Sequence, residues 1–114
     1  MSERHTLLEH PLFRVEGWDV PTRTGSARVV RMCTTPWVNV VPLTQDGQLV
    51  LVRQHRYGIG ADTLEIPGGV AEAGEDPQVA AARELVEETG YGGGTWESLG
   101  WVWSNPAILD NRTW

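Results

Sequence analysis

The stretch that decides the fold reads GVAEAGEDPQVAAARELVEETGY and covers residues 69–91. Asp76 is a favourable N-cap residue, and Pro77 suits the first helical position, where its missing N–H costs no hydrogen bond. The residues that follow are mostly good helix formers, and Gly90 is placed to end the helix as its C′ residue. The stretch therefore predicts one helix over residues 77–89.

Three glutamates share one face of this predicted helix. At about 100° per residue, Glu84, Glu87 and Glu88 fall within an arc of roughly 100°. This pattern is locally unfavourable, because Glu84 and Glu88 repel at i,i+4 and the helix dipole disfavours negative charge in the last turn. Arg83 can offset part of the cost by reaching Glu87. Clustered carboxylates suit a hard divalent cation, and a solvated acidic face is the alternative interpretation.

The same helical count predicts which face meets the core. Val79, Ala82 and Val86 fall on the side opposite the glutamates and are expected to pack inward. Ala80 and Ala81 flank the acidic face, and their small side chains are expected to leave room for a ligand to approach it.

The complete spacing resembles the Nudix box, G-x5-E-x7-R-E-U-x-E-E-x-G-U, in which U is a large aliphatic residue. Tyr91 departs from the pattern at the final aliphatic position, which is a packing position. So many fixed residue types at fixed spacings make a chance match rare. The residues that fit are Gly69, Glu75, Arg83, Glu84, Leu85, Glu87, Glu88 and Gly90.

The flanking sequence resembles one group within this family, the ADP-ribose pyrophosphatases. This resemblance rests on LVRQHR at residues 51–56, LEIPGG at residues 64–69, and Pro106 beyond the box. The resemblance implies an α+β fold, an α/β/α Nudix-type sandwich with a mixed sheet and the box helix. Strands are expected on both sides of that helix, with a hairpin at Asp46-Gly47. The predicted strands cover residues 12–20, 27–32, 37–43, 48–53, 63–66 (stopped by Pro67-Gly68-Gly69) and 96–103.

Two segments are expected. Residues 1–36 form a strand-rich lead-in that could build a homodimer, as the N-terminal strands of the resembled group do. Residues 37–114 form the Nudix domain, and the resemblance implies that the C-terminal part of the fold is missing. A natural short form, a truncated product and completion by another chain all remain open.

The resemblance implies hydrolysis of the pyrophosphate in a nucleoside diphosphate linked to another moiety, most of all ADP-ribose to AMP and ribose 5-phosphate. Mg²⁺ is the implied cofactor, and Mn²⁺ could substitute. One alternative is a nucleotide-binding or sensing module without turnover. The other is a housecleaning pyrophosphohydrolase of nucleoside triphosphates.

The resemblance also implies roles for individual residues. Metal ligands would be Glu84, Glu87, Glu88 and the carbonyl of Gly68, and the catalytic set would be these glutamates with Arg83. Arg56, and more weakly Arg53, would contact the substrate. Glu75 could pair with Arg83 or with a metal-bound water, and the supporting residues would be Gly69, Glu75 and Gly90.

Composition limits the partners. The net charge of −6 argues against a nucleic-acid partner, so a small nucleotide must be bound through local positive charge or metal. All nine basic residues are arginines, whose planar, forked donors suit phosphate oxygens. Cys33 is the only cysteine, and neither a secretory signal nor a membrane-length apolar run is visible. A cytoplasmic protein is therefore expected.

Overall fold

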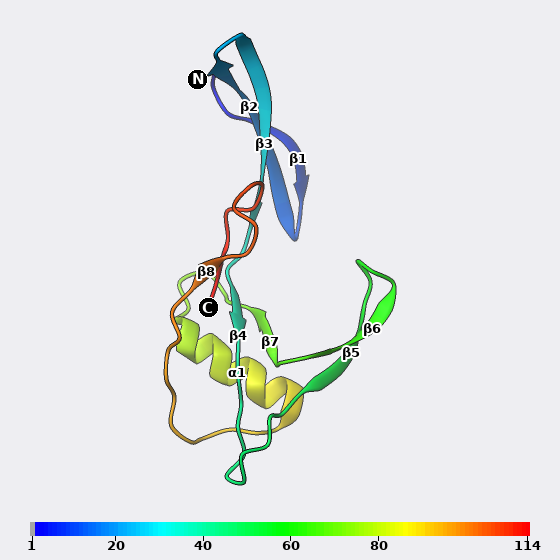
Figure 1. The fold of residues 1–114 in the computed structure, drawn as a ribbon, viewed down its shortest axis with the longest axis vertical. Coiled ribbons are helices and arrows are strands. Elements are labelled where there is room, and N and C mark those ends of the chain that lie inside the picture. Colours follow the sequence, from blue (N-terminus) through cyan, green and yellow to red (C-terminus); the bar gives the residue numbers. More distant parts are fainter. Residues whose placement is uncertain (1) are drawn as a thin grey trace. The chain divides into compact units, whose positions relative to one another are not determined.

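The structure is a computed structural model that describes residues 2–114. It contains strands and a single helix, α1, among those residues (Figure 1), which is the α+β class that the sequence predicts. The second helical layer of the expected sandwich is absent from residues 2–114. The chain divides into two compact units. One extends to Pro36 and also includes Trp101–Thr113, and the other comprises Trp37–Gly100 with Trp114.

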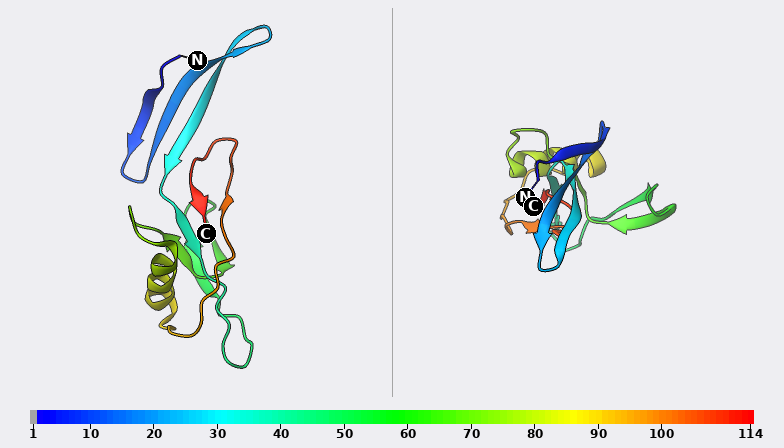
Figure 2. Two further views of the ribbon diagram at one scale, coloured as in Figure 1. Left: turned by 90° about the vertical axis from the view of Figure 1, so that its left-hand side faces the viewer. Right: turned by 90° about the horizontal axis from the view of Figure 1, so that it is seen from above.

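The first unit is built on an antiparallel sheet in the order β1-β2-β3 (Figure 2). These strands are β1 (His5–His10), β2 (Phe13–Thr22) and β3 (Gly25–Thr34). The sequence predicts β2 and β3, but not β1. Leu7 and Leu8 are adjacent apolar residues that break the alternation of a strand, and the pairing with β2 shifts register there.

A C-terminal segment lies along β3 in the same unit. The backbone N–H of Met32 donates to the Ile108 carbonyl at 2.7 Å, and the N–H of Thr34 donates to Asp110 Oδ1 at 3.0 Å. The segment contains the short antiparallel pair β8 (Val102–Trp103) and β9 (Arg112–Thr113).

The predicted strand over residues 96–103 is wrong for most of its length. Only Val102 and Trp103 have a strand partner in the described residues, and Gly100 adopts a positive φ of 87° that interrupts any extended run. The rings of Trp101 and Trp103 meet edge to face at 5.0 Å, so both side chains lie on one side of the segment, as their alternation predicts.

The second unit contains two antiparallel strand pairs. The strands β4 (Trp37–Asn39) and β7 (Gly68–Val70) form one pair, with Val38 opposite Gly69. The strands β5 (Val52–Arg56) and β6 (Ala61–Glu65) form the other. Pro67-Gly68-Gly69 thus ends one strand and begins the next, whereas the sequence predicts only an end.

The turn predicted at Asp46-Gly47 is confirmed, but the long strands predicted around it are not. The N–H of Thr44 donates to the Gln48 carbonyl at 2.9 Å, and Gly47 has a φ of 79°. Pro42 has no N–H to donate, so it only accepts a bond, from Val50 N at 3.0 Å. The hydrogen-bond ladder of the hairpin therefore stops before it reaches β4. The strand β5 pairs with β6 instead.

Helix α1 (Pro77–Thr89) begins and ends as the sequence predicts. The Asp76 carboxylate accepts hydrogen bonds from the N–H groups of Gln78 and Val79, and Pro77 occupies the first turn. Gly90 has a φ of 76° and donates its N–H to the Val86 carbonyl at 2.9 Å. With 13 residues, α1 does not qualify as a membrane span, and the described residues contain no other helix.

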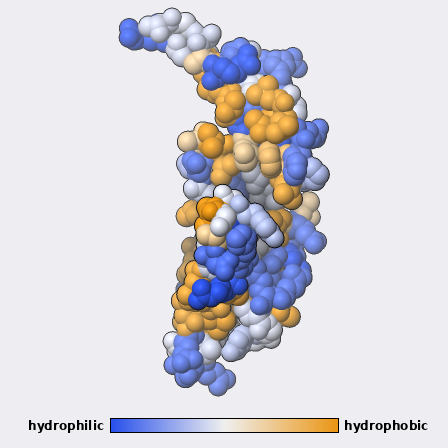
Figure 3. Space-filling model, turned by 90° about the vertical axis from the view of Figure 1, so that its right-hand side faces the viewer, coloured by the Kyte–Doolittle hydropathy of each residue, from blue (hydrophilic) through white to orange (hydrophobic). Residues whose placement is uncertain are grey.

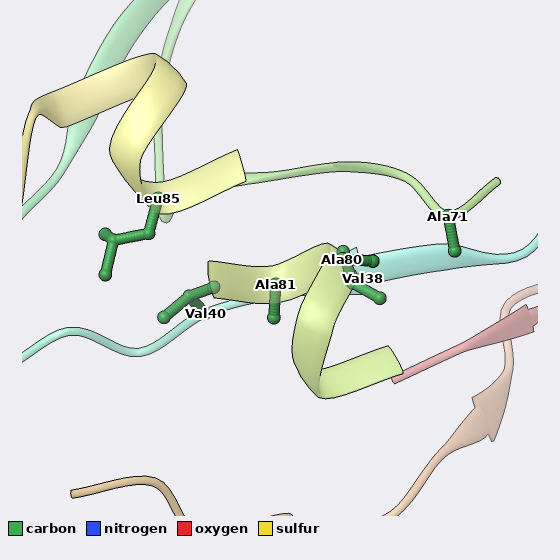
Figure 4. Packing of buried hydrophobic residues seen from close by; sticks show 6 residues of the cluster. All are labelled: Val38, Val40, Ala71, Ala80, Ala81 and Leu85. Atoms are coloured by element: carbon green, nitrogen blue, oxygen red, sulfur yellow. The ribbon is translucent and has the colours of Figure 1, made fainter. Parts of the chain in front are cut away.

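The core lies between α1 and the β4–β7 pair (Figure 4), but the predicted helix face is wrong. Val79 and Val86 are 59% and 54% exposed. The inward face carries alanines instead, and their small side chains let the helix approach the strands closely. The glutamate side of the helix is therefore the side that meets β7. The buried core comprises Val38, Val40, Ala71, Ala80, Ala81 and Leu85, with Trp96 and Trp114 packed against it.

This small core leaves many apolar side chains accessible. Figure 3 shows apolar patches interspersed with polar ones on one face of the molecule. In the second unit an open hollow of about 1120 Å³ is bounded by residues 38–45, residues 91–100 and one side of α1. Its lining includes Val41, Leu43 and Leu99, all more than half exposed.

Substitutions on α1 test which face is buried. We expect Leu85→Ala to lower the free energy of unfolding by about 2–5 kcal/mol, because Leu85 is only 6% exposed and its removal leaves a cavity. Val86→Ala, the matched control on the outer face, should change it by less than about 0.5 kcal/mol. Urea denaturation followed by circular dichroism provides the measurement. Equal losses in the two variants would contradict the burial pattern.

Candidate active site

Two glycines of β7 lie directly against the acidic face of α1. A Cβ atom at Gly69 would overlap the Glu84 carboxylate, so only glycine leaves that carboxylate its place. Gly68 N–H donates to Glu88 Oε2 at 3.3 Å. Packed against Gly69, the Glu84 side chain is only 13% exposed. Glu84 and Glu88, one helical turn apart, therefore converge on the backbone at the start of β7.

Glu87 is arranged differently from the other two glutamates. Its side chain is 57% exposed, and one carboxylate oxygen lies 3.6 Å from Arg83 Nη1. Among residues 2–114, no three Asp, Glu, His or Cys side chains are gathered closely enough to hold a metal ion. The set of three glutamate ligands therefore stays a prediction, with two of its members at the β7 turn and the third directed to solvent.

Arg83 connects the loop before α1 to the acidic face. Its Nε and Nη2 atoms donate to the two oxygens of Glu75 at 3.1 and 2.9 Å, so Arg83 is the one of the two expected partners that Glu75 contacts here. Nη1 donates to Glu84 at 2.9 Å, and Nη2 also donates to the Val70 carbonyl at 3.1 Å. One guanidinium thus fixes two box carboxylates and the end of β7.

The electrostatics of this cluster keep its members charged. Hydrogen bonds from Arg83, and then from the backbone N–H of Glu72, hold the pKa of Glu75 below its ordinary value. Glu75 in turn raises the pKa of Arg83 further above its already high value. The charged Arg83 guanidinium also lies beside Glu84 and Glu87, so it offsets part of the like-charge repulsion on the helix.

A second arginine, Arg56, approaches the same region from β5. It donates from Nε and Nη2 to the Glu65 carboxylate at 3.0 and 2.6 Å, and its guanidinium lies 5.8 Å from the centre of the Trp37 ring. The bond to Glu65 is the largest cause that raises the pKa of Arg56, and the negative charge of Glu88 contributes as well. Arg56 is therefore within electrostatic range of the acidic face.

Arg53 is not brought to the same place. Exposed and half-buried residues alternate along β5, so Arg53 extends from the face opposite that of Gln54 and Arg56. The sequence reasoning also misses two residues of the arrangement, Glu65 and Trp37. The sequence could have indicated Glu65, because it is two residues from Thr63 in the same strand. This spacing puts both side chains on the face of the hairpin that carries Arg56.

The large hollow of the second unit does not coincide with the carboxylates. Its lining includes Ala81 and Leu85 of α1 but none of the three glutamates. Among the described residues its lining is mostly apolar or glycine, and its one charged member, Glu97, is negative, so the hollow offers no positive charge for phosphates. The acidic face at β7, with Arg56 and Arg83 beside it, is the better candidate for chemistry.

Comparison with known proteins decides the family. The NUDIX domain matches residues 34–112, which include the strands and the helix around the acidic face. The chain belongs to the Nudix family. This membership confirms the resemblance carried by the box, and the matched residues include the glutamate face of α1.

Similar Nudix proteins include two enzymes that act on ADP-linked compounds. The chain is 36% identical to the ADP-ribose pyrophosphatase of Bacillus subtilis over 93 residues, which is 81% of this chain and 50% of that protein. It is 41% identical to the ADP-sugar pyrophosphatase of Mus musculus over 80 residues, 67% of this chain and 37% of that one.

Two further similarities extend the picture. The methanol dehydrogenase activator of Bacillus methanolicus is 48% identical over 54 residues, 47% of this chain and 29% of its own. The crystal structure of an ADP compounds hydrolase superimposes with a TM-score of 0.80 at 29% identity, over 97% of this chain and 61% of that one. The chain spans about half or less of the length of these curated relatives.

The two β7 glycines should respond differently to alanine. A Cβ at Gly68 would press on the Val38 carbonyl, which is rigid backbone, and we expect Gly68→Ala to cost about 1–3 kcal/mol of unfolding free energy. At Gly69 the obstacle is the flexible end of Glu84, so Gly69→Ala should cost less and displace that carboxylate instead. Gly58→Ala, in open space, is the control. Chemical denaturation measures all three, and an equal cost at Gly58 and Gly68 would contradict the packing.

The Arg56–Glu65 pair predicts a pH dependence. The bond from Arg56, followed by that from Thr63, lowers the pKa of Glu65 from 4.5 to about 2. Because the folded pKa is depressed, the stabilisation is complete above about 4.5 and is lost as the pH falls through about 2. Titration of the Glu65 side-chain carboxyl by ¹³C NMR should give a midpoint near 2, and Arg56→Ala should raise it. A midpoint unchanged by Arg56→Ala would refute the assignment.

Proposed function

We propose that this protein is a divalent-metal-dependent hydrolase of the pyrophosphate in a nucleoside diphosphate linked to another moiety, with ADP-ribose as the first candidate substrate. Water would attack a phosphorus atom, and the products would be AMP and ribose 5-phosphate. The observation that carries the proposal is the convergence of Glu84 and Glu88 on the side-chain-free backbone of Gly68 and Gly69.

The residues present suit a hard divalent cation. Glu84 and Glu88 supply carboxylate oxygens, and the absence of any Cβ at Gly69 keeps the Glu84 carboxylate at the β7 backbone. We propose Mg²⁺, with Mn²⁺ able to substitute, held by Glu84, Glu88, Glu87 and the carbonyl of Gly68. When bound, such an ion would neutralise phosphate charge and lower the pKa of a coordinated water.

The surrounding residues would bind and orient rather than react. Arg83 is occupied by Glu75, Glu84 and the Val70 carbonyl, so its proposed part is to hold the Glu84 carboxylate in place. Glu75 fixes Arg83 in turn, while Gly90 ends the helix one residue after Thr89. Arg56 would meet the negative charge of the diphosphate, which the net charge of −6 otherwise repels.

The relatives narrow the substrate class. Two are named for ADP-ribose and ADP-sugar pyrophosphatase activity, and the structural neighbour is an ADP compounds hydrolase. We infer from them an ADP-linked substrate. Arg53 lies on the opposite face of β5 from Arg56, so it is proposed only as a secondary contact with that substrate.

Oligomeric state and location are also proposals. The segment 1–36 is proposed to support a homodimer, because the edge strand β1 and the turn after it expose Leu7, Leu8 and Leu12. Residues 37–114 are proposed as the Nudix domain. A cytoplasmic location accords with the single cysteine, Cys33, which is half-buried and unbridged.

Product analysis of the 114-residue chain tests the function. With Mg²⁺ and ADP-ribose we expect release of AMP, and without metal we expect none. Glu84→Gln and Glu88→Gln should each slow the reaction on the order of 100-fold or more while leaving the fold intact. Glu97→Gln makes the same chemical change at an exposed position and should leave the rate unaltered.

The other functions would give different results. Binding of ADP-ribose without metal-dependent products would favour a sensing module. Release of pyrophosphate from nucleoside triphosphates would favour a housecleaning enzyme. Full activity in both the Glu84→Gln and Glu88→Gln variants would show that the acidic face is not the site.

A further inference from the structure

Glu65 is the most heavily hydrogen-bonded carboxylate of the β5–β6 hairpin. It accepts bonds from Arg56, from Thr63 Oγ1 at 2.8 Å and from Gln54 Nε2 at 2.8 Å. Three donors from both strands therefore fix the position of its two oxygens. A carboxylate held in this way is a rigid acceptor for the guanidinium beside it.

The geometry of the Arg56–Glu65 pair leaves one side of the guanidinium available. A guanidinium has five N–H donors, and Glu65 engages Nε and Nη2. Among the residues that the structure describes, Nη1 of Arg56 donates no hydrogen bond. The Trp37 ring, 5.8 Å away, further limits where the group can move.

Glu65 is linked to the acidic face by a short connection. Only Ile66 and Pro67 separate it from Gly68, and Pro67 is fully buried, with its carbonyl accepting a bond from Val40 N at 2.8 Å. Trp37 lies at the same turn, since a Cβ at Gly68 would approach Trp37 Nε1. The position of Arg56 is thus tied through Glu65 and Trp37 to the backbone beside Glu88.

We propose that Glu65 is a positioning residue, which holds the Arg56 guanidinium with its Nη1 side free to donate to a phosphate oxygen of a nucleoside diphosphate substrate. This inference rests on the proposed function, and it adds a residue that lies outside the box. Because Glu65 fixes the arginine before the substrate arrives, less side-chain freedom is lost on binding. Loss of Glu65 should therefore weaken substrate binding more than it slows the chemical step.

The experiment uses the complete 114-residue chain with Mg²⁺ and ADP-ribose. We expect Glu65→Gln to raise KM by roughly 10-fold or more, with kcat changed by less than about 3-fold, because the amide offers one acceptor oxygen instead of two. Asp62→Asn is the matched control. It makes the same change on the same hairpin but breaks only the exposed pair with His55, and it should leave KM unaltered.

A double-mutant cycle separates positioning from a general structural effect. If Glu65 acts through Arg56, then Glu65→Gln should raise KM only slightly further in a chain that already carries Arg56→Ala. Thermal unfolding checks that each variant is folded. If Glu65→Gln does not fold, Thr63→Val removes one bond to Glu65 without touching Arg56, and it should raise KM by a smaller factor.

The outcomes distinguish this inference from the proposed function. An unchanged KM in folded Glu65→Gln (or in Thr63→Val, if that variant is used), or additive effects in the cycle, would overturn the positioning role while leaving the hydrolase intact. Weaker ADP-ribose binding by Glu65→Gln in calorimetry, with no product from either chain, would support the role while the hydrolase proposal fails. A wild-type chain that neither binds nor cleaves ADP-ribose would overturn both.

Discussion

The close approach of α1 to β7 is the constraint on which the rest of the structure depends. Ala80 and Ala81 are buried against the strands, and Gly68 and Gly69 remove every side chain from the opposing backbone. Larger residues at these positions would separate the two elements or displace the Glu84 carboxylate. The small residues therefore do two things at once: they allow dense packing, and they let carboxylates reach a strand from the helix.

This packing explains how an unfavourable charge pattern persists. Like charges one turn apart repel, but Glu84 is paired with Arg83 and Glu88 accepts a backbone N–H. Two arginines flank the acidic face, and each is held by a glutamate outside it, Arg83 by Glu75 and Arg56 by Glu65. Fixed arginines bring positive charge to one place on a chain whose overall charge is −6.

Local rules predict local structure well and packing poorly in this chain. Asp76, Pro77 and Gly90 define the ends of α1 through bonds within a few residues, so the helix is predictable from its own sequence. The inward face is not, because the apolar stripe formed by Val79 and Val86 satisfies the usual pattern for burial and yet is exposed. The strand partners are equally hard to predict from the sequence, since β5 could pair either with residues 37–43 or with β6.

The sequence by itself determined the helix, its caps, the turn at Gly47 and the family, because these follow from residue types at short, fixed spacings. It also determined which residues are candidates for the site. Only the tertiary structure decided that Glu84 and Glu88 meet the β7 glycines, that Glu87 faces solvent, and that Glu65 holds Arg56. Those contacts depend on how closely the helix packs and on which strands pair, and both are set by residues far apart in the chain.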